Sequence, residues 1–407
     1  MMKALACAAA AVLAWQGAAM AQRSSHDHHH HASAAACAEP TLRCADKVTP
    51  TFASDGTLWL AFAAAQKVLV ARSSDSGHSF APPLSINAEP LELDLGPVAR
   101  PKIAVDGQGR VAVAFAVFKD RALNGQVFHT RSTDGGKTFA PPRPITNDPE
   151  SQRFETLAFD DVGSLFAAWL DKRGRAAARA RNEKYDSAEL AFAWSNDQGE
   201  TLSDARIAQN NTCECCALAI AFAAAGRPVV AFRNIFEGGA RDHAIVTFSD
   251  LQTPGPVNRV SVDDWRTDVC PHQGPSLAIS PDGVYHVSWF TNGLRRKGLF
   301  YARSQDSGRT FSKPLAVGDQ QRASSQPYLV ALPQALWLAW KQFDGEETTV
   351  LLMNSRDGGK NWTSPRSVAR TSDSSDHPLL IAQGDRVFLS WMTRAQGYQF
   401  ISLEDLP

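Results

Sequence analysis

Paired runs of apolar residues recur along this chain, and large apolar side chains alternate with small or polar ones inside each run. A period of two is typical of β-strands that bury one face, and the small residues joining the two runs of a pair favour a tight turn. The pattern therefore predicts seven β-hairpins, at Thr51–Ala63, Lys102–Phe115, Thr156–Trp169, Ala217–Phe232, Ser276–Phe290, Tyr328–Trp340 and Leu379–Trp391.

A third apolar run follows the hairpins. After the last hairpin this run is Tyr398–Leu403, and the chain then ends without a fourth run. An unpaired strand at that point would leave a sheet edge open to association with other chains. We therefore expect the segment Leu42–Val48 to add the missing fourth strand to the last sheet.

A short motif, S-x-D-x-G-x-(S/T/N)-(F/W/L), occurs five times after such runs. An Asp carboxylate can accept hydrogen bonds from backbone N–H groups of its own turn, and Gly supplies the left-handed backbone conformation that the turn needs. The motif therefore predicts one turn, used repeatedly. Its copies are SSDSGHSF (Ser73–Phe80), STDGGKTF (Ser132–Phe139), SNDQGETL (Ser195–Leu202), SQDSGRTF (Ser304–Phe311) and SRDGGKNW (Ser355–Trp362).

This motif resembles the Asp-box repeat of the sialidase superfamily, and the resemblance covers nearly all of residues 39–407. The motif aspartates are 59, 63, 109 and 51 residues apart, and the long interval fits two repeats with a degenerate copy at Ser249-Asp250. The resemblance implies an all-β fold, a single β-propeller of four-stranded antiparallel blades. The hairpin count predicts seven blades, and the six blades of the superfamily's sialidases are the alternative.

The N-terminus predicts export. Met1–Ala21 has an early lysine, an apolar run and Ala19-Met20-Ala21 as a cleavage site, so we expect a signal peptide and a periplasmic or secreted protein. Residues 22–38 are rich in His, Ala and Ser without apolar periodicity, which predicts a disordered tail. Its five histidines could capture metal ions, or the tail could be a neutral linker.

Charge excludes some partners. The formal net charge is −1 and the isoelectric point is about 6.8, which leaves no basic footprint for nucleic acid. The apolar runs are too short and too interrupted to span a membrane as helices.

The cysteines mark the first candidate site. Cys37 and Cys44 are expected to pair in a disulfide, while Cys213, Cys215, Cys216, Cys270 and His272 directly precede the first strands of the fourth and fifth hairpins. In a propeller the first strands line the central channel, so the segments that enter them meet at one mouth of it. The candidate metal ligands there are Cys213, Cys215, Cys216, Cys270 and His272, with His377 from across the channel.

Three interpretations of this Cys/His cluster remain open. In an oxidising compartment the cysteines could form disulfides. Thiolate and imidazole ligands select copper or zinc, so the cluster could instead bind a soft metal ion. A redox role is the third, although the CxxCH haem motif is absent. The main hypothesis is a binding protein for copper or zinc, or for a glycan or protein ligand beside the metal.

The resemblance also implies an enzymatic alternative, a secreted sialidase-like glycoside hydrolase. Such enzymes clamp a sugar carboxylate with three arginines and use a tyrosine nucleophile activated by a glutamate. Arg100, Arg153, Glu155 and Tyr328 stand near strand entrances here, and Arg233 could complete the clamp. None of these residues lies in a motif specific enough to carry a role over by itself.

Overall fold

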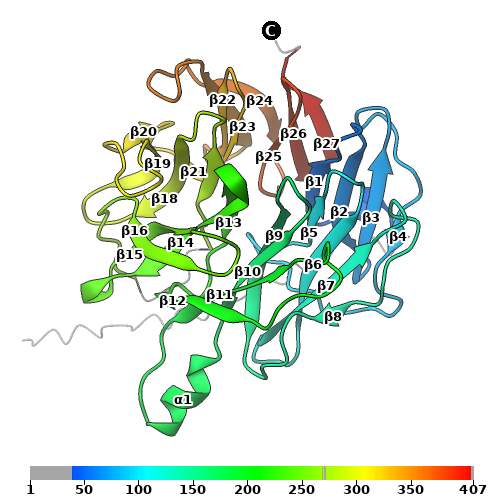
Figure 1. Ribbon diagram of the computed structural model, residues 1–407. Coiled ribbons are helices and arrows are strands. Elements are labelled where there is room, and N and C mark those ends of the chain that lie inside the picture. Colours follow the sequence, from blue (N-terminus) through cyan, green and yellow to red (C-terminus); the bar gives the residue numbers. More distant parts are fainter. Residues whose placement is uncertain (1–38, 268, 270–271, 405–407) are drawn as a thin grey trace, which may run out of the picture. The chain divides into compact units, whose positions relative to one another are not determined.

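The structure, a computed structural model, describes residues 39–267, 269 and 272–404. The predicted signal peptide, the His-rich tail, Cys37 and Cys270 lie outside the described residues. Cys37–Pro407 forms one compact unit. Its described part is all-β apart from the short helix α1 (Gly174–Ala180) and the 3-10 turns η1 (Leu42–Cys44), η2 (Ala224–Gly226) and η3 (Glu237–Gly239) (Figure 1).

The strands form antiparallel sheets that follow chain order. The first sheets contain β1 (Val48–Phe52), β2 (Leu58–Ala64), β3 (Lys67–Ser73) and β4 (Leu84–Ser85), then β5 (Lys102–Val105), β6 (Val111–Phe118), β7 (Gly125–Ser132) and β8 (Arg143–Pro144). The next are β9 (Gln152–Phe159), β10 (Leu165–Asp171), β11 (Ala188–Ser195) and β12 (Arg206–Thr212), then β13 (Ala219–Ala223), β14 (Arg227–Ile235), β15 (Arg241–Phe248) and β16 (Pro254–Arg259). A bridge between Thr212 and Asn234 joins these last two groups into one eight-stranded sheet.

Three further sheets complete the fold. They contain β17 (Ser276–Ile279), β18 (Tyr285–Asn292), β19 (Lys297–Ser304) and β20 (Leu315–Val317), then β21 (Ala323–Ala331), β22 (Leu336–Phe343), β23 (Thr348–Ser355) and β24 (Arg366–Thr371), and finally β25 (Leu379–Gln383), β26 (Arg386–Thr393) and β27 (Gly397–Ser402). All seven predicted hairpins are present as antiparallel pairs.

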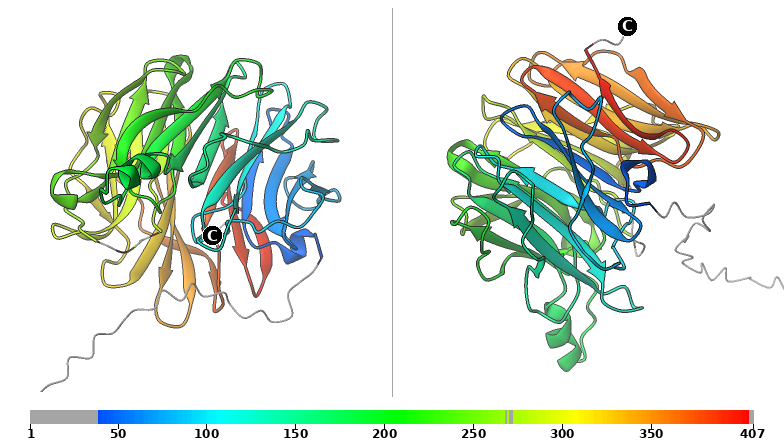
Figure 2. Two further views of the ribbon diagram at one scale, coloured as in Figure 1. Left: turned by 90° about the horizontal axis from the view of Figure 1, so that it is seen from below. Right: turned by 90° about the vertical axis from the view of Figure 1, so that its right-hand side faces the viewer.

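The first strands of successive groups contact one another. β1 contacts β5, β5 contacts β9, and the series continues through β13, β17 and β21 to β25, which contacts β1. Figures 1 and 2 show the C-terminal strands β25–β27 beside the N-terminal strands β1–β3. The second strands β2 and β10 are buried at every residue, which fits their nearly continuous apolar sequences.

The expected fourth strand of the last sheet is absent from the described residues. Leu42–Cys44 forms the 3-10 turn η1, and the last sheet has the three strands β25, β26 and β27. Leu42 and Cys44 pack instead with Met392 and Tyr398 in an apolar cluster. The prediction of a pairing strand was therefore wrong, because this segment covers the last sheet with side chains and adds no backbone hydrogen-bond ladder.

The five repeated turns share one set of hydrogen bonds. In each, the Ser hydroxyl donates to the Asp carboxylate at 2.5–2.8 Å and accepts the Gly N–H at 2.8–2.9 Å. The residue four positions after the Asp donates its backbone N–H to the same carboxylate, as Thr138 does to Asp134 at 3.0 Å. The carboxylate thus organises the turn that the motif predicts.

Four tryptophans at equivalent positions are core residues. Trp169, Trp289, Trp340 and Trp391 are each at most 1% exposed and lie in four different apolar clusters.

Among the described residues, no helix is long and apolar enough to cross a membrane.

Candidate functional site at the strand entrances

Charged and polar side chains gather where the first strands begin. We define the entrance cluster as Arg100, Lys102, Glu155, Tyr328, Lys341, Asp376 and His377. The charges of these residues act on one another: the pKa of His377 responds to Arg100, Asp376, Lys341 and Lys102, and that of Lys102 to Arg100, Glu155 and Asp376. The sequence predicts Arg100, Glu155, Tyr328 and His377 near strand entrances, and the structure brings them into one electrostatic group.

Arg100 is held by an internal ion pair. Its two terminal nitrogens donate to both carboxylate oxygens of Asp376 at 2.9 and 2.7 Å, and one also donates to the Val48 carbonyl at 3.2 Å. Arg100 is 4% and Asp376 5% exposed. The pair therefore joins the second sheet to the last one and neutralises a buried cation.

The other two arginines of the expected clamp also have internal partners. Arg153 donates to both carboxylate oxygens of Asp94 at 2.6 and 2.8 Å. Arg233 is 1% exposed, donates to the carbonyls of Arg241 and Phe290, and stacks on the Trp265 ring at 4.1 Å. A carboxylate ligand would have to compete with these contacts.

Backbone bulges mark two first strands. In β9 the pairing register shifts next to Phe154, whose φ is +58°, and in β21 it shifts around Gln326, whose φ is +53°. Glu155 lies with Phe154 inside the first bulge, and Tyr328 directly follows the second. Bulges are common next to functional sites because they re-aim side chains. A non-glycine residue at positive φ also carries strain, and strained residues cluster at such sites.

Glu155 is a buried acid. It is 4% exposed and forms no salt bridge with any other described residue. Burial raises the pKa of Glu155 to about 7, against the opposing effect of Lys102. Burial and the Arg100 charge lower the pKa of Lys102 to about 8. Both groups therefore change protonation close to neutral pH, as residues that transfer protons do.

Tyr328 faces His377. The two rings lie edge to face with centroids 5.7 Å apart. Burial and Arg100 lower the pKa of His377 to about 3, so the imidazole is neutral at neutral pH. Burial raises the pKa of Tyr328. Nearby, Lys341 donates to the carbonyl and hydroxyl of Ser375 at 3.0 and 3.2 Å, and burial lowers the pKa of Lys341 to about 8.

The three neighbouring cysteines form a compact sulfur cluster. The Cys213 Sγ lies 3.8 Å from that of Cys215 and 3.5 Å from that of Cys216, and all three are at most 3% exposed. The Arg241 guanidinium lies 3.6 Å from the Cys213 Sγ. Hydrogen bonds from the other two thiols hold the pKa of Cys213 well below its usual value, whereas burial raises the pKa of Cys216 to about 12.

The other predicted metal ligands are not part of that cluster. Among the described residues, Cys213, Cys215 and Cys216 are the only metal-type ligand atoms grouped within 4.8 Å of one another, so His272 and His377 lie outside the group. Cys270 is outside the described residues. Cys44 is disulfide-bonded, and the predicted partner Cys37 is also outside the described residues.

Several residues of the site escaped sequence analysis. Asp94 lies in a loop, and nothing local marks it as the partner of Arg153. Arg241 begins β15 and reaches Cys213 only through the tertiary fold. Lys341 could have been found in the sequence. A charged residue follows Trp340 there, whereas the apolar residues Leu170 and Met392 follow the equivalent Trp169 and Trp391.

Comparison with solved structures shows the fold. A polysaccharide lyase, an ulvan lyase bound to a GlcA–Rha3S ligand, has a TM-score of 0.56 at 11% identity and covers 88% of this chain and 93% of its own. A Hadza microbial sialidase has a TM-score of 0.52 at 15% identity, over 86% of this chain and 77% of its own. A protein of unknown function from Dyadobacter fermentans has a TM-score of 0.52 at 17% identity, over 76% and 93%.

The fold is thus one that a sialidase and polysaccharide lyases share, and at these identities the similarity extends to the fold alone. No family model matches the sequence, and no curated protein matches it.

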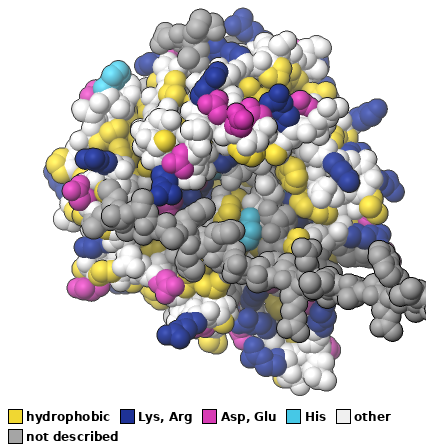
Figure 3. All heavy atoms as spheres, turned by 180° about the vertical axis from the view of Figure 1, so that it is seen from behind, with side chains coloured by type: hydrophobic (Ala, Val, Ile, Leu, Met, Phe, Trp, Pro, Cys, Tyr) yellow, Lys and Arg dark blue, Asp and Glu magenta, His cyan; other side chains and the backbone are white. Residues whose placement is uncertain are grey.

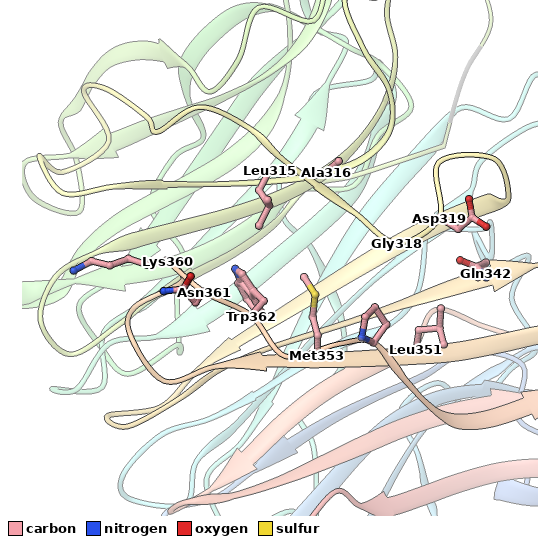
Figure 4. Close-up of a pocket in the computed structure, with 11 residues that line it drawn as sticks. Leu315, Ala316, Gly318, Asp319, Gln342, Leu351, Met353, Lys360, Asn361 and Trp362 are labelled. Carbon is pink, nitrogen blue, oxygen red and sulfur yellow. The ribbon is translucent and has the colours of Figure 1, made fainter.

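A separate cavity of about 580 Å³ lies at the seam between β20 and β23. Figure 4 shows Leu315 of β20 opposite Trp362 and Met353. None of the entrance cluster is among its described lining residues. On the face shown in Figure 3, basic and acidic side chains are interspersed. The cavity is therefore separate from the entrance cluster, where the pKa values of Lys102, Glu155 and His377 are shifted.

Proposed function

We propose that Cys37–Pro407 is a closed seven-bladed β-propeller that acts on a glycan at the mouth formed by the entrance cluster. The series of contacts from β1 through β25 and back to β1 supports the blade count. The six-bladed alternative would require two of the seven hairpins to share one blade. The bridge between β12 and β14 is a single residue pair, which is too little pairing for that.

The observation that carries the functional proposal is the pair of bulges at Phe154 and Gln326. Each adjoins a residue with chemistry that glycan cleavage uses, the acid Glu155 and the phenol Tyr328. A carboxyl group with a pKa near neutral can donate a proton to a leaving sugar oxygen and take it back from water. The likeness to a sialidase and to polysaccharide lyases supports the proposal only as far as the fold.

Within the alternative enzyme classes, hydrolysis of a neutral or hydroxyl-rich glycan fits better than recognition of a sialic acid. Arg100, Arg153 and Arg233 already have internal partners, so a sugar carboxylate would gain no free guanidinium. Tyr328 packs against a neutral His377 ring and can donate a hydrogen bond to a sugar hydroxyl.

The test is hydrolysis by Glu155→Gln protein. We expect wild-type protein to release product from at least one member of a panel of aryl glycosides and plant or algal polysaccharides. Loss of the proton donor should lower kcat/KM by about 10²- to 10⁴-fold. Glu189→Gln is the matched control, because Glu189 is also a buried glutamate whose pKa is raised by burial, but it lies on β11 and bonds to Tyr185.

An equal rate for Glu155→Gln and wild type on a cleaved glycan would contradict the assignment of Glu155. If a glycan binds without being cleaved and its affinity is lost in Tyr328→Phe, the protein is a lectin that binds its ligand at the same mouth.

A further inference from the structure

We propose that Cys213, Cys215 and Cys216 together bind one thiophilic metal ion, of the Cu(I) or Zn(II) class. This proposal concerns a site separate from glycan chemistry and does not depend on it. The three sulfur atoms come from one short segment between β12 and β13, and each cysteine is buried in the apolar cluster that also holds Val98 and Phe154.

The spacing of the sulfurs fits a single ion. Metal–sulfur bonds in thiolate sites are about 2.3 Å long, so two sulfurs on one ion lie about 3.8 Å apart in a tetrahedral site and about 4.0 Å apart in a trigonal one. The observed separations from Cys213 are 3.8 and 3.5 Å, and all three sulfurs are within 4.8 Å of one another. Shifts of at most about one ångström would let one ion contact all three.

The backbone holds this segment in place. Thr212, 0% exposed, ends β12, pairs with Asn234 of β14, and donates its hydroxyl to the Ala188 carbonyl at 2.7 Å. The Cys213 N–H donates to the Arg233 carbonyl at 2.9 Å. The first ligand is therefore positioned by strands on both sides, which reduces the ordering cost of binding an ion.

Charge at the site also favours a thiolate-bound ion. Three thiolates with a monovalent or divalent ion leave a net negative charge, which is costly in a buried site. The Arg241 guanidinium at 3.6 Å from the Cys213 Sγ offsets it, and the Arg233 charge acts on the same sulfur. Soft thiolate ligands select Cu(I) and Zn(II) over magnesium and calcium, which prefer oxygen.

The experiment uses the reduced full-length protein. Cu(I) is titrated anaerobically against a competing chelator, and the bound metal is then examined by X-ray absorption. We expect wild type to bind about one ion per chain more than Cys213→Ser/Cys216→Ser, and to show sulfur neighbours at about 2.3 Å. The His-rich tail, which includes Cys37, is the same in both proteins, so sulfur neighbours that are present in wild type and absent from the double variant belong to the three cysteines.

Glu214→Gln is the matched control, because Glu214 lies in the same segment and pairs with Lys172 but supplies no sulfur. It should retain the full metal content. Circular dichroism checks that each variant is folded. A wild-type absorption spectrum with nitrogen and oxygen neighbours alone would overturn the proposal, whatever the variants do. So would a Cys213–Cys216 disulfide that persists under reductant, detected by mass spectrometry.

Discussion

At the scale of single residues, the entrance cluster is defined by burial of ionisable groups. Burial moves the pKa of Glu155 upward and those of Lys102, Lys341 and His377 downward, so each shift favours the neutral form. Neutral acids and bases beside each other can pass protons without building up charge. The ion pair of Arg100 with Asp376 is the exception, because each of its members has an opposite charge in contact.

A pH prediction follows for His377. Its folded pKa is about 3, below the ordinary 6.5, so the neutral form contributes stability above pH 6.5 and that contribution is lost as pH falls toward 3. The loss is at most about 1.4 kcal/mol per pH unit for one proton. His377→Gln cannot take up this proton, so its unfolding free energy should fall less steeply between pH 6.5 and 4.

Urea unfolding measured at several pH values checks this expectation. The difference between variant and wild type should be constant above pH 7, where His377 is neutral in both folded and unfolded chains. Parallel curves over the whole range would show that His377 titrates normally.

At the scale of the element, the repeated turn has two neighbouring residues with positive φ, and in two of its copies both are glycines. In the second copy both Gly135 and Gly136 have positive φ, at +68° and +74°. A Cβ on Gly135 would meet nothing within 4 Å, whereas one on Gly136 would overlap the Trp59 ring of the preceding sheet. The motif's glycine therefore allows both a backbone conformation and the contact between adjacent sheets.

Alanine substitutions at these two positions separate the cost of backbone strain from the cost of disturbed packing. Gly135→Ala should cost about 1–2 kcal/mol of unfolding free energy through the left-handed backbone alone. Gly136→Ala should cost about 1–3 kcal/mol more, because the methyl group also displaces Trp59. Chemical denaturation of both variants is the measurement, and equal losses would mean that Trp59 moves aside without cost.

At the scale of the whole compact unit, one buried ion pair links the second sheet to the last one. Arg100 and Asp376, 276 residues apart, form the buried pair there, with Lys47 at 3.6 Å from the same carboxylate. Removing one member leaves the other charged and buried. Asp376→Leu should therefore lower the unfolding free energy by about 3–5 kcal/mol.

A second variant keeps that prediction specific. Arg100→Met with Asp376→Leu removes both charges and should lose less than Asp376→Leu alone, since no buried charge is left without its partner. Glu404→Ala removes a partner from the exposed Arg386 pair and should cost about 0–1 kcal/mol. If the double variant is no more stable than Asp376→Leu alone, the loss of unfolding free energy comes from packing and not from an unpaired charge.

The sequence by itself determined the strands, the hairpins and the repeated turns, because alternation and turn chemistry act over a few neighbouring residues. It placed Arg100, Glu155, Tyr328 and His377 near one mouth because each precedes or begins a first strand. Only the tertiary structure decided that Asp376 pairs with Arg100 and Asp94 with Arg153, that His377 faces Tyr328, and that three cysteines converge without His272. Those outcomes depend on pairing and burial between segments far apart in the chain, where local pattern carries no information.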